Sequence, residues 1–324
     1  MRFIRKGLLC LLLSGGALAN NAETEFVSQW QAEGLDRAYL EQALELAQKD
    51  QAVIDAITRP WEAKPWYQYY PLFLTEKRLA AGLAFWQEHE ALLEQAYQRF
   101  GVEPEIVVSI IGIETFYGGY LGNYSVLDAL YTLGFHYPPR QTFFRKELGH
   151  FLQLAQQQGW SLTEPKGSYA GAMGLGQFIP SSYQAYAVDF DGDGQRDLFT
   201  NPADAIGSVA NYFARHRWQA GESVASPLTL ADGALDDALL WDGKPLRHST
   251  EILQQQGARL PANTSGPVGV VRLEVDEAQF QYQLVHPNFY AITRYNRSPL
   301  YAMAVWQFSQ QLKQGMHEAG DESQ

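Results

Sequence analysis

The spacing of apolar residues predicts that most of the chain is helical. From Leu35 to Ile57 and again from Leu79 to Phe100, apolar side chains recur every three or four positions, which places them on one face of a helix. Arg59-Pro60 ends the first stretch, because a residue before proline avoids helical backbone angles, and Gly101 can end the second. The same spacing predicts further helices over residues 142–158, 202–217 and 301–312.

One predicted helix is apolar almost all the way round. It opens at Glu103-Pro104-Glu105, where proline suits the first turn and acidic residues complement the helix dipole. Its body, from Ile106 to Phe116, has almost no polar face, so we expect a buried central helix. Tyr117-Gly118-Gly119 closes it.

The pattern changes after Gly221. Val271, Leu273 and Val275 alternate with polar residues, and the same alternation follows from Phe280 to Leu284, which predicts two strands. The sequence therefore predicts a mainly α protein with a small β-containing insertion near residues 222–285. The polar ending HEAGDESQ is expected to form a frayed tail.

The N-terminus has the three parts of a secretory signal peptide in order. Arg2, Arg5 and Lys6 supply positive charge, and an apolar run too short to span a bilayer follows from Leu8 to Leu13. Ala17-Leu18-Ala19 is a small-x-small cleavage site. The alternative is a buried N-terminal helix, which does not explain why the three parts occur in this order.

Composition narrows the function further. The only cysteine, Cys10, lies inside the apolar run, so a processed chain has neither disulfide nor thiol chemistry. Leu9 stands where a lipoprotein signal needs a small residue, which favours a soluble product over a lipid-anchored one. The net charge of −12 argues against nucleic acid as a partner. The scattered histidines form no zinc motif, and no serine-hydrolase elbow is present.

Glu114 is the first candidate for catalysis. It lies near the C-terminal end of the apolar helix, one turn after Ile110 and Ile111. Burial and the negative end of the helix dipole both raise the pKa of a carboxyl group, which then stays protonated near neutral pH and can donate a proton. A structural, salt-bridged or solvent-exposed glutamate is the alternative that the helix alone leaves open.

A second candidate is the small-residue loop from Gly167 to Ser182, GSYAGAMGLGQFIPSS. Its glycines and alanines let a ligand approach the backbone closely, although a tight structural connection has the same composition. A nucleotide-binding loop is excluded, because the loop has neither the G-x-G-x-x-G order nor a G-K-[ST] ending.

Four ordered segments together resemble the B-type lytic transglycosylases, which cleave peptidoglycan on a lysozyme-like fold. They are SIIGIETFYGG, GSYAGAMGLGQFIPSSY, DAIGSVANYF and NFYAITRYNRSPLYAMAVWQ, and the similarity runs from about Trp66 to Gln307. With the patterns above, the resemblance implies a signal peptide at 1–19, a helical N-terminal region at 20–100, a lysozyme-like catalytic core at 101–221, a small β-containing subdomain at 222–285, a return to the core at 286–316 and a flexible tail at 317–324.

The resemblance also assigns roles to residues. Glu114 matches the catalytic glutamate of the family, and Arg140 matches a groove arginine suited to a peptide carboxylate. The other positions that resemble the substrate-binding groove are Ser168, Gln177, Phe178, Tyr212, Tyr295, Asn296, Tyr301 and Tyr69. Core packing is the alternative for each aromatic residue. For Tyr69, core packing and a groove role carry equal weight.

Only one carboxylate accompanies these motifs, whereas ordinary glycosidases use two. The mechanism that the resemblance implies is therefore substrate-assisted. Glu114 protonates the oxygen between N-acetylmuramic acid (MurNAc) and N-acetylglucosamine (GlcNAc), the MurNAc acetamide stabilises C1, and Glu114 then deprotonates the C6 hydroxyl to form a 1,6-anhydro ring. Asn296 and the Tyr295 hydroxyl are candidates to hold the acetamide. The alternatives are a hydrolytic muramidase and a non-catalytic wall-binding scaffold.

The segment DFDGDGQRDLF predicts a calcium site. Asp189, Asp191 and Asp193 occupy positions 1, 3 and 5 of an EF-hand-type loop, and Gln195 supplies a backbone carbonyl at position 7. Position 12 lacks the usual glutamate, and Asp204 resembles the family's replacement for it. An acidic surface turn is the alternative. We expect structural Ca²⁺, no organic cofactor and a periplasmic location. The expected partners are peptidoglycan strands, with cell-wall synthases as candidate protein partners.

Overall fold

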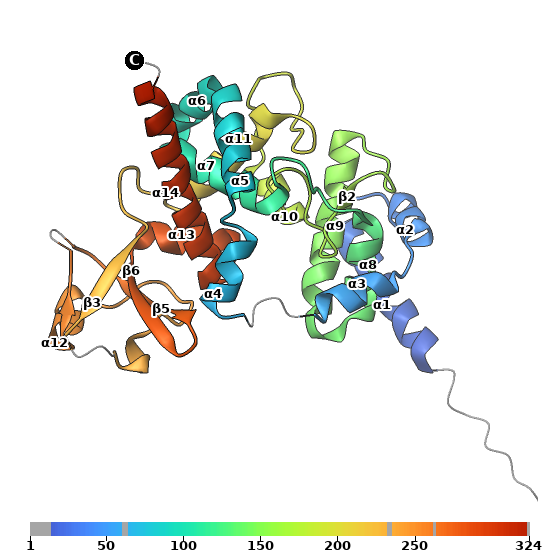
Figure 1. Ribbon diagram of the computed structural model, residues 1–324. Helices are drawn as coiled ribbons and strands as arrows, with labels where there is room; N and C mark the ends of the chain where they lie inside the picture. The colour runs from blue at the N-terminus through green and yellow to red at the C-terminus, as the bar shows by residue number, and fades with distance from the viewer. Residues whose placement is uncertain (1–13, 60–63, 232–234, 262–263, 323–324) are drawn as a thin grey trace, which may run out of the picture. The chain divides into compact units, whose positions relative to one another are not determined.

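The computed structural model describes residues 14–59, 64–231, 235–261 and 264–322, with backbone alone for residues 14–20 and 321–322 (Figure 1). The signal-peptide charges and apolar run therefore lie outside the described residues, and the predicted cleavage site falls on backbone within the first helix. No helix in the described ranges has the length and apolar character that crossing a membrane requires. The chain divides into two compact units, which are described separately.

The first unit contains residues up to 59, 122–173 and 178–184. Its helices and short strands are α1 (Ser14–Ala32), α2 (Arg37–Leu46), α3 (Gln51–Ile57), β1 (Tyr124–Ser125), α8 (Val126–His136), η2 (Pro138–Arg140), α9 (Gln141–Gln158), β2 (Lys166–Gly167) and the first part of α10 (Pro180–Tyr186). Helices α8 and α9 pack against each other, and their buried faces include Leu130, Phe144 and Phe151.

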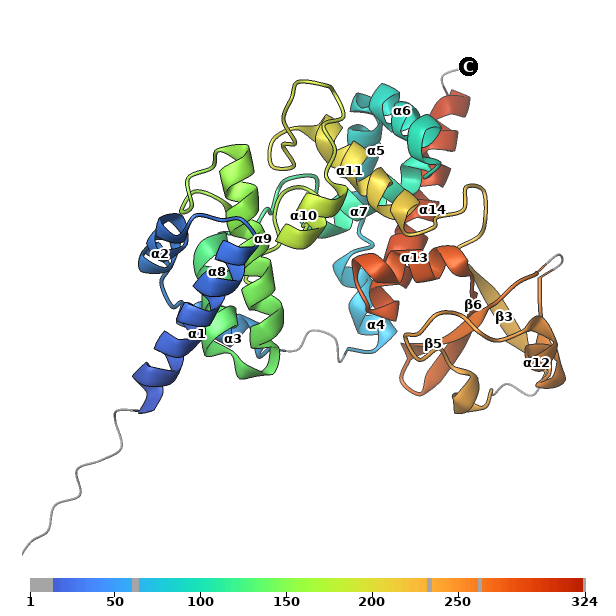
Figure 2. The ribbon, with the colours of Figure 1, turned by 180° about the vertical axis from the view of Figure 1, so that it is seen from behind.

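The second unit contains residues 60–121, 174–177 and 185–324. Its helices are α4 (Trp66–Tyr69), η1 (Tyr70–Leu72), α5 (Glu76–Glu88), α6 (Glu90–Phe100), α7 (Pro104–Thr115), α11 (Pro202–Arg215), η3 (Asp237–Leu239), α12 (Thr250–Gln255), α13 (Pro287–Tyr295) and α14 (Pro299–Glu322). Helix α7 is the central helix that the apolar pattern predicts, since every residue from Glu105 to Ile113 is buried. Helix α14 packs along α7 and α5, and the Ser109 hydroxyl donates to the Val305 carbonyl at 3.1 Å (Figures 1 and 2).

A four-stranded antiparallel sheet lies between α11 and α13 in the chain. Its strands are β3 (Ala225–Leu230), β4 (Ala258–Arg259), β5 (Gly269–Asp276) and β6 (Gln279–Val285), in the spatial order β4-β3-β6-β5. One face covers a small core that includes Leu253, Val270 and Leu284, to which α12 contributes (Figure 1). The predicted hairpin is confirmed as β5 and β6. The period-two pattern missed β3, which contains a proline, and the two-residue β4.

Three helix boundaries differ from the apolar pattern. The stretch from 35 to 57 is two helices, because the side chains of Asp36 and Asp50 each cap a new N-terminus. The stretch from 79 to 100 is interrupted at His89. Helix α14 continues to Glu322, so residues 317–322, expected to be a frayed tail, are helical.

Candidate active site

The site residue Glu114 is held at an abrupt helix end. Phe116 and Tyr117, directly after α7, both adopt left-handed backbone angles with φ of 52° and 58°. A non-glycine residue pays about 1–2 kcal/mol for that conformation, so the surrounding structure must enforce it. Helix α7 therefore ends before the predicted closing glycines, and the penultimate residue of the helix is Glu114.

Two neighbours secure this helix end. The Thr115 hydroxyl lies 3.1 Å from the Ile111 carbonyl and 2.9 Å from the Leu175 carbonyl, and it accepts from the Gly118 amide. The Tyr117 ring lies against Gly112, where an added Cβ would stand 2.3 Å from the Tyr117 hydroxyl oxygen. Thr115 was not identified from the sequence, because a threonine in a helix carries no signal of the loop that it reaches.

Arg78 is another residue that the sequence did not reveal. Its Nε donates to the Gly112 carbonyl at 3.1 Å, and its Nη1 donates to the carbonyl of Leu72 at 2.9 Å. The guanidinium thus ties α5 to the segment before it and to the last turn of α7. Its charge also lies 5.4 Å from the centroid of the Phe116 ring, one of the two left-handed residues.

Burial raises the pKa of Glu114 to about 7. The Tyr301 hydroxyl donates to Glu114 Oε1 at 2.5 Å, and this bond lowers the pKa because it stabilises the carboxylate. Desolvation is the larger of the two effects, so Glu114 binds and releases a proton near neutral pH. The upward shift of this pKa agrees with the expectation from the apolar helix.

Three of the predicted groove tyrosines gather near Glu114. Tyr212 and Tyr295 are in ring contact at 4.7 Å, and the Tyr295 hydroxyl donates to the Gly176 carbonyl at 2.5 Å. Burial, and then the charge of Glu114, raise the pKa values of Tyr295 and Tyr301 well above the usual value. Both phenols therefore remain protonated and act as hydrogen-bond donors.

Gln177 belongs to the same unit through the glycine loop. It is left-handed at φ 50°, and its Nε2 lies 3.2 Å from the Leu121 carbonyl and 3.0 Å from the Gly174 carbonyl. Gly174 permits this loop to touch its neighbour, because an added Cβ would stand 2.4 Å from the Leu198 oxygen. The side chain of Gln177 thus braces the loop internally.

Asn296 and Tyr69 complete the predicted residues of the second unit. The Asn296 Oδ1 accepts from the Ser298 amide at 3.0 Å at the end of α13. Tyr69 is buried, packs against Trp66 and Phe73, and its charge would raise the pKa of Tyr301. Tyr69 therefore combines the packing role with proximity to Tyr301.

The remaining predicted groove residues belong to the first unit. The Ser168 hydroxyl accepts from the amides of Ala170 and Ala172. The Arg140 guanidinium lies 4.4 Å from the centroid of the Phe143 ring. Phe178 is only 2% exposed, and its amide and carbonyl bond to Met173. Packing therefore accounts for the Phe178 ring within this unit.

The acidic loop brings three of the predicted metal ligands together. Carboxylate oxygens of Asp189, Asp191 and Asp204 lie within 4.8 Å of one another. Asp189 accepts from the amides of Gly192 and Gly194, which folds the loop around it. Asp193 accepts from the Gln195 amide and is not part of this cluster.

The donor set of this loop fits a hard divalent cation, because Ca²⁺ prefers carboxylate and carbonyl oxygens. Buried Asp204 accepts from the amides of Phe190 and Asp197, both at 2.7 Å, so it also fixes the loop backbone. Asp197, at position 9 of the loop, was overlooked in the sequence, and its carboxylate caps the amides of Phe199 and Thr200.

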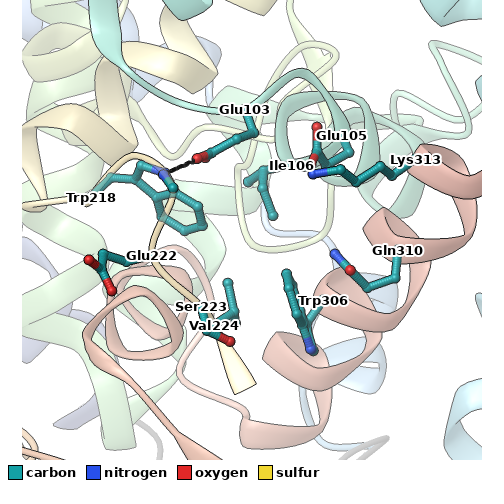
Figure 3. A pocket seen from close by; sticks show the side chains of 11 residues that line it. Glu103, Glu105, Ile106, Trp218, Glu222, Ser223, Val224, Trp306, Gln310 and Lys313 are labelled. Carbon is teal, nitrogen blue, oxygen red and sulfur yellow. Dashed lines mark hydrogen bonds and ion pairs between the residues drawn. The ribbon is translucent and has the colours of Figure 1, made fainter. Parts of the chain in front are cut away.

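A separate acidic cavity of about 230 Å³ is lined by three glutamates, Glu103, Glu105 and Glu222 (Figure 3). Glu103 accepts from Trp218 Nε1 at 2.7 Å and from the Gly221 amide at 2.6 Å. Glu105 forms an ion pair with Lys313 at 3.0 Å. The carboxylates of Glu103 and Glu105 thus link the start of α7 to its surroundings, which is a structural role.

Comparison with known proteins identifies close relatives. Residues 19–310 match the transglycosylase SLT domain. The membrane-bound lytic murein transglycosylase B of Escherichia coli strain K12 is 41% identical over 310 residues, which cover 91% of this chain and 84% of that protein.

Solved structures agree in fold. The soluble lytic transglycosylase SltB1 of Pseudomonas aeruginosa gives a TM-score of 0.85 at 43% identity, covering 92% of this chain and 99% of that one. The Escherichia coli lytic transglycosylase Slt35 in complex with calcium gives 0.81 at 39% identity, covering 91% and 93%. The mainly α, lysozyme-like fold class is confirmed. This chain belongs to the transglycosylase SLT domain family.

Proposed function

We propose that Glu114 alone serves as acid and then as base in this peptidoglycan lytic transglycosylase. The observation that carries this proposal is the state of Glu114, whose pKa is raised to about 7 by burial while one tyrosine hydroxyl contacts it. A group with this pKa is well suited to donate and recover a proton near neutral pH. Its place within the family motif supports the same role.

The reaction is the cleavage of the β-1,4 bond between MurNAc and GlcNAc. Glu114 gives its proton to the glycosidic oxygen as the C1–O bond breaks, and the acetamide oxygen of MurNAc stabilises the cationic C1. The Glu114 carboxylate then takes the proton of the C6 hydroxyl, and O6 bonds to C1. The product carries a 1,6-anhydro ring, no water is consumed, and Glu114 regains its starting protonation.

The surroundings of Glu114 support a mechanism with one carboxylate. Burial raises the pKa of Glu114 and the Tyr301 bond lowers it, and neither influence is a second acid. Tyr301 and Tyr295 remain protonated and supply hydrogen-bond donors beside Glu114. Within the second unit we assign a glycan-binding role to Tyr212, Tyr295, Asn296, Tyr301, Tyr69 and Gln177. For the first unit, taken by itself, we propose that Ser168, Phe178 and Arg140 contact the substrate.

We propose that the acidic loop holds a structural Ca²⁺. Asp189, Asp191 and Asp204 would supply carboxylate oxygens, with Asp193 and the Gln195 carbonyl completing the set. The ion would neutralise the clustered carboxylates and link the loop to α11. A relative with the same fold is described in complex with calcium.

We place the mature enzyme in the periplasm, after removal of residues 1–19, where its substrate lies. The subdivision predicted from the sequence, with a catalytic core at 101–221 and 286–316 and a β-containing subdomain at 222–285, remains our proposal for the functional organisation.

Mass spectrometry of the products tests the proposed reaction. Purified peptidoglycan digested with the wild-type chain should yield muropeptides with 1,6-anhydro ends, lighter by one water than hydrolytic products. The Glu114→Gln variant should leave the same substrate intact. Reducing MurNAc ends from the wild-type enzyme would identify a hydrolytic muramidase instead, and intact peptidoglycan would favour a non-catalytic scaffold.

A further inference from the structure

The second unit contains a basic cavity that the proposed reaction does not use. It measures about 570 Å³ and lies where the C-terminal end of α11 meets one side of α13, from Pro287 to Arg294, and loops of the sheet segment (residues 225–285). Three guanidinium groups line it, those of Arg215, Arg217 and Arg294. Within the described ranges none of the three forms an ion pair with a carboxylate, although the chain has a net charge of −12.

Arg294 points to an acceptor that the protein itself does not provide. Its guanidinium lies 4.1 Å from the centroid of the Tyr290 ring, and its Nη2 donates to the Thr293 hydroxyl at 3.1 Å. Its Nε is buried and has no hydrogen-bond partner among the described residues. A buried donor without an acceptor destabilises the folded state. An anion in the cavity would remove that destabilisation.

Arg217 gives independent support. It follows the end of α11 with a left-handed backbone at φ 65°, a position where glycine is the usual residue. An arginine there is strained, and its exposed side chain adds no packing that would offset the strain. Arg217 therefore contributes a guanidinium group at the cavity.

Stabilisation of helix ends is not enough to explain all three arginines. The C-terminus of α11 carries a partial charge of about −0.5, which offsets only about half of one positive charge. Helix α13 lines the cavity from its first residue, Pro287, to Arg294, so the opposite partial charges of its two ends offset each other there. At least about two positive charges remain at the cavity, which favours an anion as its ligand.

The remaining walls define the body of the ligand. Pro245, Leu246, Pro267 and Pro287 are apolar, and Tyr290 adds an aromatic face. His216 and Gln219 are the other polar residues of the lining. A guanidinium fork pairs well with a planar carboxylate, and the apolar walls suit small aliphatic side chains.

We propose that this basic cavity binds the C-terminal carboxylate of a short peptide with small apolar side chains. As the source we assign the peptides attached to peptidoglycan, and this assignment rests on the proposed function. The cavity is also connected to the tyrosine cluster. His216, which lines it, stacks on Tyr212 at 4.1 Å, and Tyr212 contacts Tyr295.

Direct binding tests the cavity without using catalysis. We would titrate the full chain with N-acetyl-alanyl-alanine, with its C-terminal amide and with inorganic phosphate, using calorimetry. We expect binding of the acid, at least tenfold weaker binding of the amide, and weak binding of phosphate. Equal binding of acid and amide would overturn the proposal, and so would phosphate binding as tight as that of the peptide.

The variant Arg217→Gly separates binding from folding. It removes a guanidinium and relieves the left-handed strain, so the melting temperature should stay equal or rise while peptide affinity falls at least about tenfold. Arg215→Gln should weaken binding in the same direction. Arg259→Gln, the matched control on strand β4, removes the same charge away from the cavity and should leave affinity unchanged. Equal affinity in Arg217→Gly and wild type would overturn the site.

Kinetics test the assigned source. For Arg217→Gly, the ratio of kcat/KM on peptide-bearing glycan to kcat/KM on peptide-free glycan should fall several-fold relative to wild type and to Arg259→Gln. An unchanged ratio would overturn the peptidoglycan source. If the wild-type chain instead forms no anhydro products yet binds the free peptide, the proposed reaction is wrong and the carboxylate site stands.

Discussion

Two acidic regions of the second unit place carboxyl groups in opposite environments. At the end of α7, Glu114 lies on an apolar helix and accepts one hydrogen bond from a hydroxyl group. Its pKa is raised to about 7. In the loop after α10, exposed Asp191 accepts from the Asn201 side chain and the Asp193 amide, and its pKa is lowered. The same functional group is thus prepared for proton transfer in one place and for permanent charge in the other.

Asp204 shows which of the two influences is stronger. It accepts two backbone amides at 2.7 Å, yet burial is the largest effect and its pKa is raised. Its two hydrogen bonds therefore do not offset burial together with the repulsion from Asp189 and Asp191. The difference between the regions is set by access to water more than by the number of donors.

The largest effect should come from removing the proton of the buried carboxyl. Glu114→Gln keeps the shape of the side chain but cannot transfer a proton. Because one group performs both steps, we expect turnover to fall by about a hundredfold to ten-thousandfold or more. Release of soluble muropeptides measures it, with circular dichroism to verify folding. Turnover above about a tenth of wild type would contradict the sole acid/base role.

The same substitution should stabilise the protein at alkaline pH. The pKa of Glu114 is about 4.5 unfolded and about 7 folded, so the folded state binds the proton more tightly. The contribution of Glu114 to stability is therefore fully present below pH 4.5 and is lost as pH rises through 7, by at most about 3 kcal/mol. The Glu114→Gln variant does not lose this stability as pH rises, because the amide does not titrate. Denaturant unfolding of both proteins at pH 4 and pH 8 measures it, and equal pH dependence would refute the buried titration.

The acidic loop should respond to calcium through stability instead of chemistry. A ligand that binds only the folded state adds about 2.7 kcal/mol at a hundredfold excess over its Kd. A chelator should lower the Tm and millimolar calcium should restore it. Asp191→Ala should abolish this response while glycan cleavage at low temperature continues. A Tm unaffected by chelator and calcium would rule out the proposed ion, and lost cleavage in a folded calcium-free protein would make it catalytic.

The smallest effect should come from the one hydrogen bond to Glu114. Activity should decline as pH rises through about 7, because the protonated acid is lost. Tyr301→Phe removes a bond that favours the carboxylate, so the pKa of Glu114 should rise further and the alkaline limb should move to higher pH by about one unit or less. The pH dependence of kcat measures this shift. A shift of the alkaline limb towards lower pH would mean that the Tyr301 bond raises the pKa of Glu114, which would contradict this prediction.

The sequence predicted the main elements and the place of Glu114 at the end of a buried helix, because both depend on local patterns. The apolar run from Ile106 to Ile113 identified α7 and placed Glu114 at its end, and alternation identified the β5–β6 hairpin. The early end of α7 was not predictable, since the left-handed Phe116 and Tyr117 are imposed by packing. Strand β3 was missed because Pro227 and its mixed pattern hide a strand that only its neighbours complete.

The residues that reach across the fold were the hardest to predict. Thr115 and Arg78 bond to carbonyls that are distant in the chain, and no local pattern encodes those partners. The basic cavity escaped notice for the same reason, because Arg217 and Arg294 are separated by the whole sheet segment. The spacing of the acidic ligands, in contrast, is visible in the short stretch from Asp189 to Asp204.

The pairing of β3 with β6 gives the sheet segment the character of an exchangeable module. Ala225 pairs with Val285, and the His286 amide donates to the Val224 carbonyl at 3.0 Å, so the segment leaves and re-enters the helical body at one point. Its two ends are therefore already closed, and the entropy of loop closure depends only weakly on what lies between them. Evolution or design can lengthen, shorten or exchange this segment while α11 and α13 keep their places in the chain's helical framework.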